Sequence, residues 1–375
     1  MARPPVKIIG AGIGGTAAAL TLARRGFSVS VHERRPALAT EGAGFQIGPN
    51  GVKVLRALGV DAEPLGHLPR EVQLRRMASG RLLATVPMGQ TAEARWRAPM
   101  QQIRRQVLLE ALYRAAQDAG AMFEFGAQDA QPEGLTIAAD GMRSATRERL
   151  FDAGAPDYSG YAAWRGVVRG VDVPPAAQIF MGPERHLVCY PLGGGEVNFV
   201  AIERRAKPVA EDWDHSGAQA DMLARFAPLA PAARAVLEAC DAPKLWGLYV
   251  HPPMKTWVSG ETALLGDAAH PMLPFMAQGA TMALEDAWVL AACLAASPDA
   301  AGLSAYEAAR KPRCTRMQNT SAGNSGIYHR SGLIGAALHA GMWGVGKLLP
   351  SVYLSKFDWI YGADVTASSA ISSTR

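Results

Sequence analysis

The sequence has few cysteines, and they follow no pattern. Cys189, Cys240, Cys293 and Cys314 are scattered along 375 residues, without the paired spacing of a zinc site or a disulfide framework. We therefore expect reduced thiols and no bound metal. No signal peptide precedes the first strand, which starts almost at the N-terminus, so the expected compartment is the cytoplasm.

Most of the chain also has no excess of positive or negative charge. Charged residues make up 19% of the sequence, and the net charge is +5. From residue 301 onward, eight Lys or Arg stand against three Asp or Glu, and this difference of five equals the whole excess. The basic residues are neither clustered nor interleaved with stacking aromatics, so no nucleic-acid partner is expected.

An apolar stretch near the C-terminus, residues 332–349, is broken by His339, Lys347 and several glycines. A membrane-spanning helix needs about 20 consecutive apolar residues, so this stretch is not expected to cross a bilayer. A helix packed on the body or at a homodimer interface is the favoured interpretation. Interfacial membrane binding, helped by the basic tail, is the alternative.

Glycine, in contrast, is concentrated near the N-terminus in a dinucleotide fingerprint. Residues 6–9 are typical of a buried strand, 10–15 of a glycine-rich turn, 16–25 of a helix and 28–32 of a second strand, which ends at Glu33. This order of strand, turn, helix, strand and acid is the expected context of a nucleotide site. The pattern alone does not separate NAD from FAD.

Each position in the fingerprint has a physical role. Gly10 permits the tight turn, Gly12 lets a pyrophosphate approach the backbone, and Gly15 lets the helix pack on the strand. The phosphates would lie at the helix N-terminus, where free N–H groups favour anions. The Glu33 carboxylate would accept hydrogen bonds from an adenosine ribose, which argues against a 2′-phosphate there.

Two further stretches carry nucleotide-like signals. Residues 135–147, LTIAADGMRSATR, are expected to form a buried strand, a turn at Asp140 and the start of a helix. Residues 262–286 are expected to form a strand that ends at Asp267, a loop held by two prolines, and a helix that starts near Gly279. Asp267 would accept hydrogen bonds from a polyol, and the helix N-terminus would stabilise negative charge on a flavin ring.

Between residues 161 and 251, short alternating segments with Gly and Pro turns indicate an antiparallel sheet. The clearest hairpin pairs residues 185–192 with 196–203 across three glycines. His186 and Tyr190 then share one face, about 13 Å apart at roughly 3.3 Å per residue, and could flank a small ring. Ordinary sheet surface or a satisfied core position is the alternative for this pair.

These patterns predict an α/β fold with a Rossmann-like dinucleotide-binding domain, an inserted antiparallel-sheet substrate domain and a helical C-terminal segment. The dinucleotide-binding domain, an FAD-binding domain by the resemblance given below, is expected to be discontinuous, at residues 1–157 and 261–300. The substrate domain is expected at residues 158–260 and the helical segment at residues 301–375.

The three motifs together resemble those of the single-component FAD-dependent aromatic hydroxylases related to para-hydroxybenzoate hydroxylase. The stretches are GAGIGG with Glu33, AADGMRSATR, and LLGDAAHPMLPFMAQGATMALEDA. The similarity extends over most of residues 6–365. It includes the segment GAGFQIGPN at 42–50, which belongs to a loop expected at residues 41–50, and the segment SGYAAWRG at 159–166. Within the family, the likeness is to 3-hydroxybenzoate 6-hydroxylases, 6-hydroxynicotinate 3-monooxygenases and salicylate hydroxylases.

The resemblance implies roles for individual residues. The implied FAD-binding residues are Gly10, Gly12, Ile13, Gly14, Gly15, Glu33, Arg34, Arg105, Asp140, Asp267, Gly279, Ala280, Thr281 and Met282. Arg147 belongs to the motif associated with FAD and with the transient nicotinamide nucleotide. His186 and Tyr190 match a histidine and a tyrosine that contact substrate and help to deprotonate its hydroxyl. Gln46 matches the hydroxybenzoate pattern, where the hydroxynicotinate pattern has histidine.

The implied activity is hydroxylation of a small hydroxylated aromatic acid with NADH or NADPH and O2, through a flavin hydroperoxide. A phenol has a pKa of about 10, so a nearby base must favour the reactive phenolate near neutral pH. His186 is the candidate base and Tyr190 the candidate relay. The alternatives are hydroxylation of a larger ring, such as a quinone precursor, polyketide or drug, and a flavin-binding or ligand-binding protein without turnover.

The chain departs from the family pattern at two places. Between Phe123 and Ile137 it is shorter than the family by roughly the length of a β-hairpin. Pro274 stands where the 3-hydroxybenzoate enzymes have glutamine and where the hydroxynicotinate type also has proline. The choice among acids of similar size therefore stays open.

Overall fold

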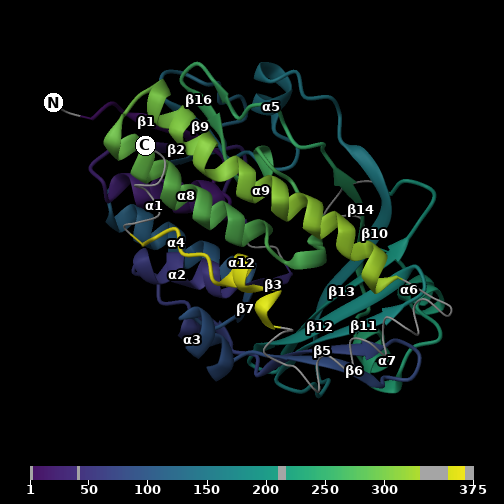
Figure 1. Cartoon of the computed structure of the whole chain (residues 1–375). Helices are drawn as coiled ribbons and strands as arrows, with labels where there is room; N and C mark the ends of the chain where they lie inside the picture. The colour runs from purple at the N-terminus through teal and green to yellow at the C-terminus, as the bar shows by residue number, and fades with distance from the viewer. Residues whose placement is uncertain (1–2, 40–42, 210–216, 330–353, 368–375) are drawn as a thin grey trace.

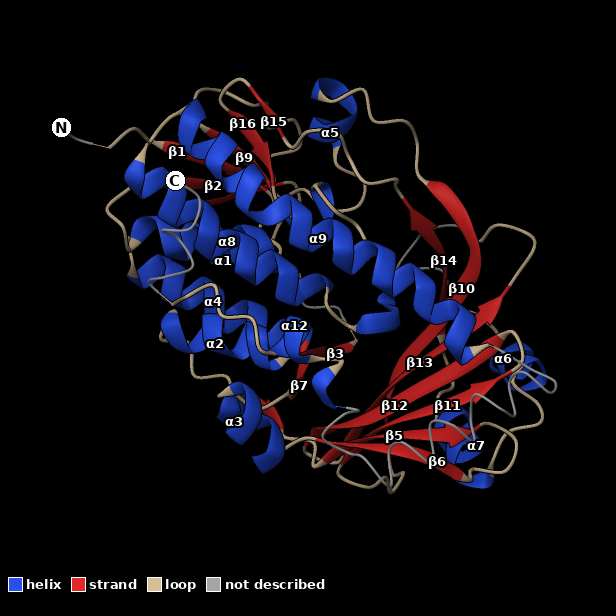
Figure 2. Cartoon of the chain, in the orientation of Figure 1, coloured by secondary structure: helices blue, strands red, loops and turns tan. Residues whose placement is uncertain are grey.

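The computed structural model describes residues 3–39, 43–209, 217–329 and 354–367, and it has two parts (Figure 1). Figure 2 shows helices gathered around one sheet in the first part, and a broad sheet that dominates the second. The long helix α9 (Ala300–Tyr328) runs from the first part to the second. The observed architecture confirms the predicted α/β class.

The first part contains a six-stranded sheet in the order β15-β16-β9-β1-β2-β8. All neighbouring strands are parallel except β15 and β16. Strand β1, helix α1 and strand β2 form the predicted Rossmann-like unit. The bounds are β1 (Val6–Ile9), α1 (Ile13–Ala23), β2 (Val29–Glu33), β8 (Met122–Phe125), β9 (Thr136–Ala138), β15 (Val258–Ser259) and β16 (Thr262–Leu264).

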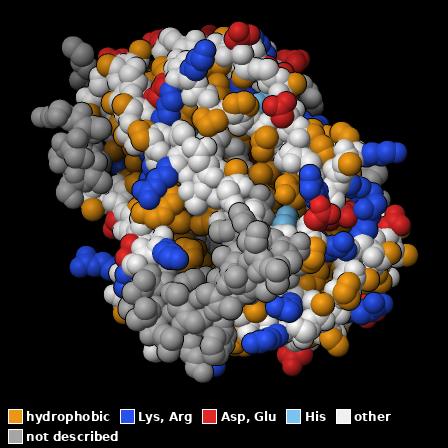
Figure 3. Space-filling model, turned by 45° about the vertical axis from the view of Figure 1, so that its right-hand side comes forward, with side chains coloured by type: hydrophobic (Ala, Val, Ile, Leu, Met, Phe, Trp, Pro, Cys, Tyr) orange, Lys and Arg blue, Asp and Glu red, His pale blue; other side chains and the backbone are white. Residues whose placement is uncertain are grey.

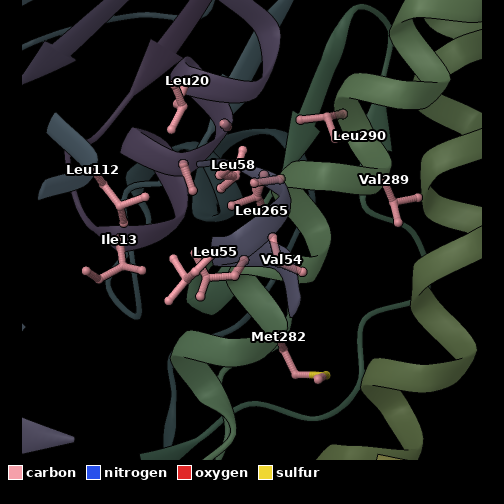
Figure 4. Close-up of a cluster of buried hydrophobic side chains, with 14 of the residues drawn as sticks. Ile13, Leu20, Val54, Leu55, Leu58, Leu112, Leu265, Met282, Val289 and Leu290 are labelled. Atoms are coloured by element: carbon pink, nitrogen blue, oxygen red, sulfur yellow. The ribbon is translucent and has the colours of Figure 1, made fainter. Parts of the chain in front are cut away.

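The helices that pack with this sheet around one hydrophobic core include α1, α2 (Pro49–Ala57), α4 (Arg105–Asp118) and α8 (Gly279–Ala296). Figure 4 shows Leu20, Leu55, Leu112 and Leu290 from these helices pointing into the same buried cluster. Among the described helices, α8 alone is long and apolar enough for a membrane span. It lies between α1 and α9 and is mostly buried, as a core helix is.

The second part is a seven-stranded sheet in the order β14-β10-β13-β12-β11-β5-β6. Its bounds are β5 (Glu71–Arg76), β6 (Leu82–Pro87), β10 (Asp157–Arg169), β11 (Ala176–Gly182), β12 (Arg185–Gly193), β13 (Glu196–Arg204) and β14 (Lys244–Val250). Strands β12 and β13 form the predicted hairpin. Helices α6 (Gln219–Arg225) and α7 (Pro231–Glu238) cover the sheet face opposite to the first part.

Strands β10 to β14 pair antiparallel with one another, which confirms the predicted antiparallel sheet. The whole sheet is mixed because it also takes up β5 and β6, which the prediction did not include. Strand β5 pairs with β11 in parallel, in a register that joins Glu71 to Ala176. Strands β5 and β6 come from residues 71–87, so the sheet also recruits chain from before residue 158. The domain boundaries at 157, 260 and 300 stay predictions.

A small third sheet, in the order β3-β7-β4, joins the two parts. It consists of β3 (Gly44–Ile47), β7 (Gln101–Arg104) and β4 (Gly66–His67). The expected loop at residues 41–50 is wrong over 44–47, because this segment gains strand hydrogen bonds from β7. Residues 41 and 42 lie outside the described residues.

The C-terminal segment is helical where the structure describes it, which confirms that prediction. It contains α9 and a short helix, α12 (Asp358–Tyr361), which docks beside α2. Arg95 and Trp96 of helix α3 (Gln90–Trp96) hold the Asp358 carboxylate at 2.6 Å and 2.8 Å. The apolar stretch 332–349, with its two interpretations, lies outside the described residues.

Candidate functional site

The glycine-rich turn has the tight geometry that its sequence predicts. Gly10 has φ +100°, and a Cβ there would lie 2.5 Å from the Ala139 carbonyl oxygen. A Cβ on Gly15 would lie 2.0 Å from the Gly10 carbonyl oxygen. Gly12 differs, because a Cβ there would meet nothing within 4 Å. The turn is closed at Gly10 and Gly15 and has open space beside Gly12.

Helix α1 begins at Ile13, directly after this turn. Its N-cap residue, Gly12, offers no side-chain hydrogen bond, so the first N–H groups of the helix can bind an anion. A Cβ on Gly14 would lie 2.7 Å from Leu265 Cδ2, which shows how closely the helix approaches the strand leading to the third motif.

The Glu33 side chain lies at the end of β2, beside the turn. Its carboxylate accepts hydrogen bonds from the Ala11 N–H at 2.8 Å and from the Arg35 N–H at 3.0 Å. Arg34 is exposed next to it. The open space at Gly12, the uncapped helix start and this carboxylate together fit a dinucleotide such as FAD.

We predict that Gly12→Ala folds normally but binds FAD at least about tenfold more weakly. The backbone of Gly12 is extended, with φ −75°, so alanine fits it, and the added methyl would occupy the space beside the uncapped helix start. Thermal unfolding without FAD and a fluorescence titration with FAD test this. Gly15→Ala is the contrasting variant: its methyl clashes with backbone, so loss of folding is expected. FAD binding by Gly12→Ala at wild-type affinity would contradict the prediction.

The second motif forms a capped helix start. Ser144 is the N-cap of α5 (Ala145–Leu150), and its hydroxyl accepts from the Arg147 N–H at 2.9 Å. Asp140 Oδ2 accepts from the Thr146 N–H at 3.2 Å, whereas its Oδ1 is buried and has no partner. Asp140 can therefore still accept a hydrogen bond from a ligand.

Arg147 connects the second motif to the third. Its buried guanidinium donates to the carbonyl oxygens of Asp267 and Ala268, at 3.2 Å and 3.1 Å, and contacts His251 Nε2 at 2.7 Å. These contacts fix the backbone on either side of the Asp267 side chain. Arg147 thus holds the backbone of the third motif in place at Asp267 and Ala268.

The third motif exposes Asp267 beside the start of α8. A Cβ on Gly279 would lie 3.7 Å from Asp267 Oδ1, so the aspartate and the helix start are close neighbours. Arg105, at the start of α4, interacts electrostatically with Asp267. Burial lowers the pKa of Arg105, and Asp267 opposes that effect. Arg105, which lies outside the three motifs, is thus brought near Asp267 of the third motif.

The first residues of α8 differ in orientation. Gly279 and Ala280 are half-buried, whereas Thr281 and Met282 are buried. Thr281 Oγ1 has no hydrogen-bond partner. Met282 belongs to the hydrophobic core, and its sulfur contacts Arg310 Nη2 at 3.8 Å. The Met282 side chain packs in the hydrophobic core, so only its backbone can contact a cofactor.

His186 and Tyr190 lie on the same face of β12, as predicted, but in separate surroundings. His186 is 1% exposed, and its ring packs 5.4 Å from Phe275 and 5.1 Å from Tyr328, centroid to centroid. Its Nδ1 lies 2.8 Å from His329 Nε2. Burial first, and His329 second, lower the pKa of His186 well below its usual value. The imidazole is therefore neutral at neutral pH.

Tyr190 is buried and stands directly opposite Asn198 of β13. Burial raises the pKa of Tyr190, although Arg165 opposes this effect. Arg165 belongs to β10, and its guanidinium lies 4.1 Å from the centre of the Trp246 ring. Burial lowers the pKa of Arg165 to about 10, so it remains a cation at neutral pH. Tyr190 is a neutral phenol near a positive charge.

Gln46 lies on β3, directly opposite Gln102 of β7. Its Nε2 is buried without a hydrogen-bond partner. The small sheet that carries Gln46 contacts β12, which carries His186 and Tyr190. Figure 3 shows hydrophobic side chains gathered on the face of the molecule between the two parts.

Sequence reasoning missed two charged or titratable residues on this face. His329 follows the end of α9 and belongs to none of the three motifs, so nothing in the sequence pairs it with His186. Arg165 lies inside the segment SGYAAWRG, and the place of that segment in the family resemblance was the available signal. Burial lowers the pKa of His329 to about 4, so this imidazole is also neutral.

Three buried residues, His270, Asp286 and Cys314, bring potential metal-ligand atoms within 4.8 Å of one another. The sequence shows no such cluster, because the residues come from separate segments. Arg310 already donates to Asp286 Oδ1 at 2.8 Å and contacts Cys314 Sγ at 3.6 Å. A cationic side chain thus occupies the position that a metal ion would need, and the cluster is better suited to an internal ion-pair network.

Comparisons with known proteins agree with this geometry. A family model described as "FAD binding domain" matches residues 93–321, which is more than half of the chain. A second, described as "NAD(P)-binding Rossmann-like domain", matches residues 8–56. These two matches cover the fingerprint, Asp140, the hairpin and the third motif.

Two curated relatives are similar over most of their length. The chain is 33% identical to 3-hydroxybenzoate 6-hydroxylase of Polaromonas naphthalenivorans, over 96% of each chain. It is 33% identical to 6-hydroxynicotinate 3-monooxygenase of Bordetella bronchiseptica, over 86% of this chain and 92% of the relative.

Solved structures share the fold. A Klebsiella pneumoniae protein, HpxO, in complex with FAD and uric acid, aligns with a TM-score of 0.80 and 27% identity, over 94% of this chain and 97% of that one. A salicylate hydroxylase in complex with substrate aligns with a TM-score of 0.81 and 23% identity, over 100% of this chain and 98% of that one.

Proposed function

The chain belongs to the FAD-dependent aromatic hydroxylases, and on this premise we propose that it hydroxylates a small hydroxylated aromatic acid. FAD is its cofactor, and NADH or NADPH is its reductant. The observation that carries the substrate class is the buried, neutral His186 imidazole, enclosed by aromatic rings on the same sheet face as Tyr190. Such a site suits one small phenolic ring.

When bound, FAD supplies the redox chemistry: it accepts a hydride from the nicotinamide and activates O2 for transfer of one oxygen atom to the ring. We assign the adenosine ribose to Glu33 and Arg34, and the pyrophosphate to the start of α1 and Arg105. We assign the sugar alcohol chain to Asp267. The start of α8, at Gly279 to Met282, supplies N–H groups that stabilise negative charge on the ring.

His186 is assigned as the base for the substrate hydroxyl. A neutral imidazole accepts a proton at only one ring nitrogen. We assign the tautomer in which Nδ1–H donates to His329 Nε2, which leaves the Nε2 lone pair of His186 for the substrate hydroxyl. His329 then acts as a positioning residue, because it fixes the orientation and the tautomer of His186. Enclosure by Phe275 and Tyr328 keeps water away from this pair.

Tyr190 is assigned as a hydrogen-bond donor, because its raised pKa keeps the phenol protonated at working pH. We predict that Tyr190→Phe lowers kcat for hydroxylation about tenfold and leaves FAD content unchanged. Steady-state product formation and the flavin absorbance of the purified variant test this. Tyr158→Phe is the control, because Tyr158 bonds the Arg205 carbonyl oxygen at the sheet margin. Unchanged product formation by Tyr190→Phe would refute the assignment.

The proposed function is tested by measuring NADH and NADPH oxidation, hydroxylated product and hydrogen peroxide in parallel with the FAD-loaded protein. The panel contains 3-hydroxybenzoate, 6-hydroxynicotinate and salicylate, because proteins similar to this chain are named for them. Strong stimulation with equal amounts of product supports the proposal. Stimulation that yields peroxide alone identifies a ligand that is not the substrate. No stimulation by any small acid would favour a larger ring, or a protein without turnover.

We also place the protein in the cytoplasm. Its four cysteines are all free thiols in the fold, and three of them are buried, as suits a reducing compartment. The homodimer stays a prediction, because the residues expected at its interface lie outside those described.

A further inference from the structure

We propose that Gln102, together with Gln46 and Asn198, forms a subsite that binds the carboxylate of the aromatic acid through neutral amide N–H groups. This inference rests on the proposed function and names the contact that makes the substrate an acid. It assigns the carboxylate to the small sheet and the hydroxyl to His186.

The first step concerns the face of the small sheet. Gln46 of β3 and His67 of β4 are both paired with Gln102 of β7, one on each side. Residues directly opposite in an antiparallel ladder project to the same face, with Cβ atoms about 5 Å apart. The three side chains therefore form one polar row across the sheet.

The second step identifies what this face meets. Gly44 shares the face with Gln46, and its N–H donates to Asn198 Oδ1 of β13 at 2.7 Å. A Cβ on Gly44 would lie 2.4 Å from Leu192 Cδ2 of β12. Tyr190 is the residue paired with Asn198. The face that carries the polar row thus meets β12, the strand of Tyr190, on the side where the substrate is proposed to bind.

The third step is the state of the amide groups. Gln102 is 0% exposed, and neither its Nε2 nor its Oε1 has a hydrogen-bond partner. Gln46 Nε2, Asn198 Nδ2 and His67 Nε2 are likewise buried and unpartnered. Buried polar atoms without partners are rare in folded proteins, so three such side chains along one face of the small sheet, together with Asn198 of β13, point to a bound polar group.

The neighbouring residue on β7 differs in its amide N–H groups. Gln101 is also 0% exposed, but it projects to the opposite face, where its Nε2 donates to the Ala62 carbonyl oxygen and its Oε1 has no partner. Of two adjacent, fully buried glutamines, Gln101 therefore has a partner for its N–H donors within the fold, and Gln102 has none.

The chemistry of the row suits a carboxylate. A carboxylate accepts hydrogen bonds at both oxygens, and Gln46, Gln102 and Asn198 each offer amide N–H donors. No acidic side chain belongs to the row, and Arg104, on the same face, is already paired with Glu196 at 2.6 Å. The buried cation of Arg165, near Tyr190, adds a favourable field for an anion.

The test compares an acid with its neutral amide. The probes are 3-hydroxybenzoate and 3-hydroxybenzamide, or the same pair built on whichever panel acid stimulates the wild type. Dissociation constants come from the change in flavin absorbance, and KM and kcat from product formation. Gln102→Glu is expected to weaken binding of the acid about 30-fold or more, through like-charge repulsion, and to change binding of the amide less than about threefold.

Two further variants make the result decisive. Gln102→Met removes the donors without adding charge, and about tenfold weaker binding of the acid is expected, with kcat less affected than KM. Gln101→Met is the matched control, and it should leave the acid-to-amide affinity ratio at the wild-type value whatever it does to stability.

Equal effects of Gln102→Glu on acid and amide, or none, would overturn the subsite and indicate that ordered water fills the row. A wild type that responds to no aromatic acid would overturn the proposed function, and the subsite with it. If the wild type hydroxylates an acid, and the Gln102 variants keep the wild-type acid-to-amide affinity ratio, then the subsite alone is overturned.

Discussion

Replacing His186 by alanine is expected to lower kcat/KM for the aromatic acid by about 10²-fold to 10⁴-fold, while FAD stays bound. His186 lies on β12 of the large sheet, whereas the residues assigned to FAD belong to the first part. Without a base, the substrate hydroxyl stays protonated near neutral pH, and its ring reacts poorly with an electrophilic oxygen. Oxidation of NADH or NADPH should continue and yield hydrogen peroxide.

Two measurements separate a missing base from a disturbed fold. A ring-fluorinated analogue of the same acid has a more acidic hydroxyl, so His186→Ala should slow its hydroxylation much less. Added imidazole should restore part of the rate, because the substitution leaves a ring-sized space among Phe275, Tyr328 and His329. An equal loss with both substrates and no rescue would refute the role of His186 as base.

The pH dependence follows from the same burial. Burial and His329 lower the pKa of His186, and burial lowers the pKa of His329 to about 4. Both rings therefore stay neutral just below pH 6.5, where a free imidazole gains a proton, and kcat/KM should not fall there because of them. These groups contribute stability that is present above about pH 6.5, the unfolded value, and is lost as the pH falls through the folded values.

The parts of the site that could be predicted from the sequence are those formed by residues adjacent in the chain. Gly10, Gly12 and Gly15 carry their geometry locally, since the turn needs a positive φ at Gly10 and close packing at Gly15. The shared face of His186 and Tyr190 followed from the two-residue period of a strand and from the three glycines that close the hairpin.

The remainder depends on contacts between distant segments. Strand β3 forms because β7, more than 50 residues later, supplies its hydrogen bonds, and a glycine-rich stretch gives no local sign of that pairing. Strand β5 pairs with β11 about 105 residues further on. His329 reaches His186 only because α9 extends from the first part to the large sheet. Gln102 looked no different from Gln101 until the register of β7 was known.

Replacing Asp286 by alanine is expected to lower the free energy of unfolding by about 3–5 kcal/mol. Its buried carboxylate accepts from the Gly266 N–H at 3.2 Å, from His270 Nε2 at 2.5 Å and from Arg310 Nε at 2.8 Å. Burial alone would raise the pKa of Asp286, but His270 and Arg310 lower it to about 2. Removing this anion leaves buried His270 without its carboxylate and leaves Arg310 with Glu285 alone, at 2.7 Å.

The same substitution should weaken FAD retention. Gly266 and His270 flank Asp267, so Asp286 holds in place the loop that carries the residue assigned to the cofactor. Denaturant unfolding at one fixed FAD concentration gives the stability, because bound FAD adds its own stabilisation. Arg234→Ala breaks an exposed pair with Glu238 and serves as the control, with an expected change below about 0.5 kcal/mol.

A double variant distinguishes an unpaired charge from lost packing. Asp286→Leu with Arg310→Met removes both charges. His270 can then lose its proton, and Glu285 keeps Arg313 at 2.8 Å as its partner. The double variant should therefore be less destabilised than the sum of the two single variants, by more than about 1 kcal/mol. Additive effects would show that the cost comes from packing, and that the buried charges of this network do not depend on one another.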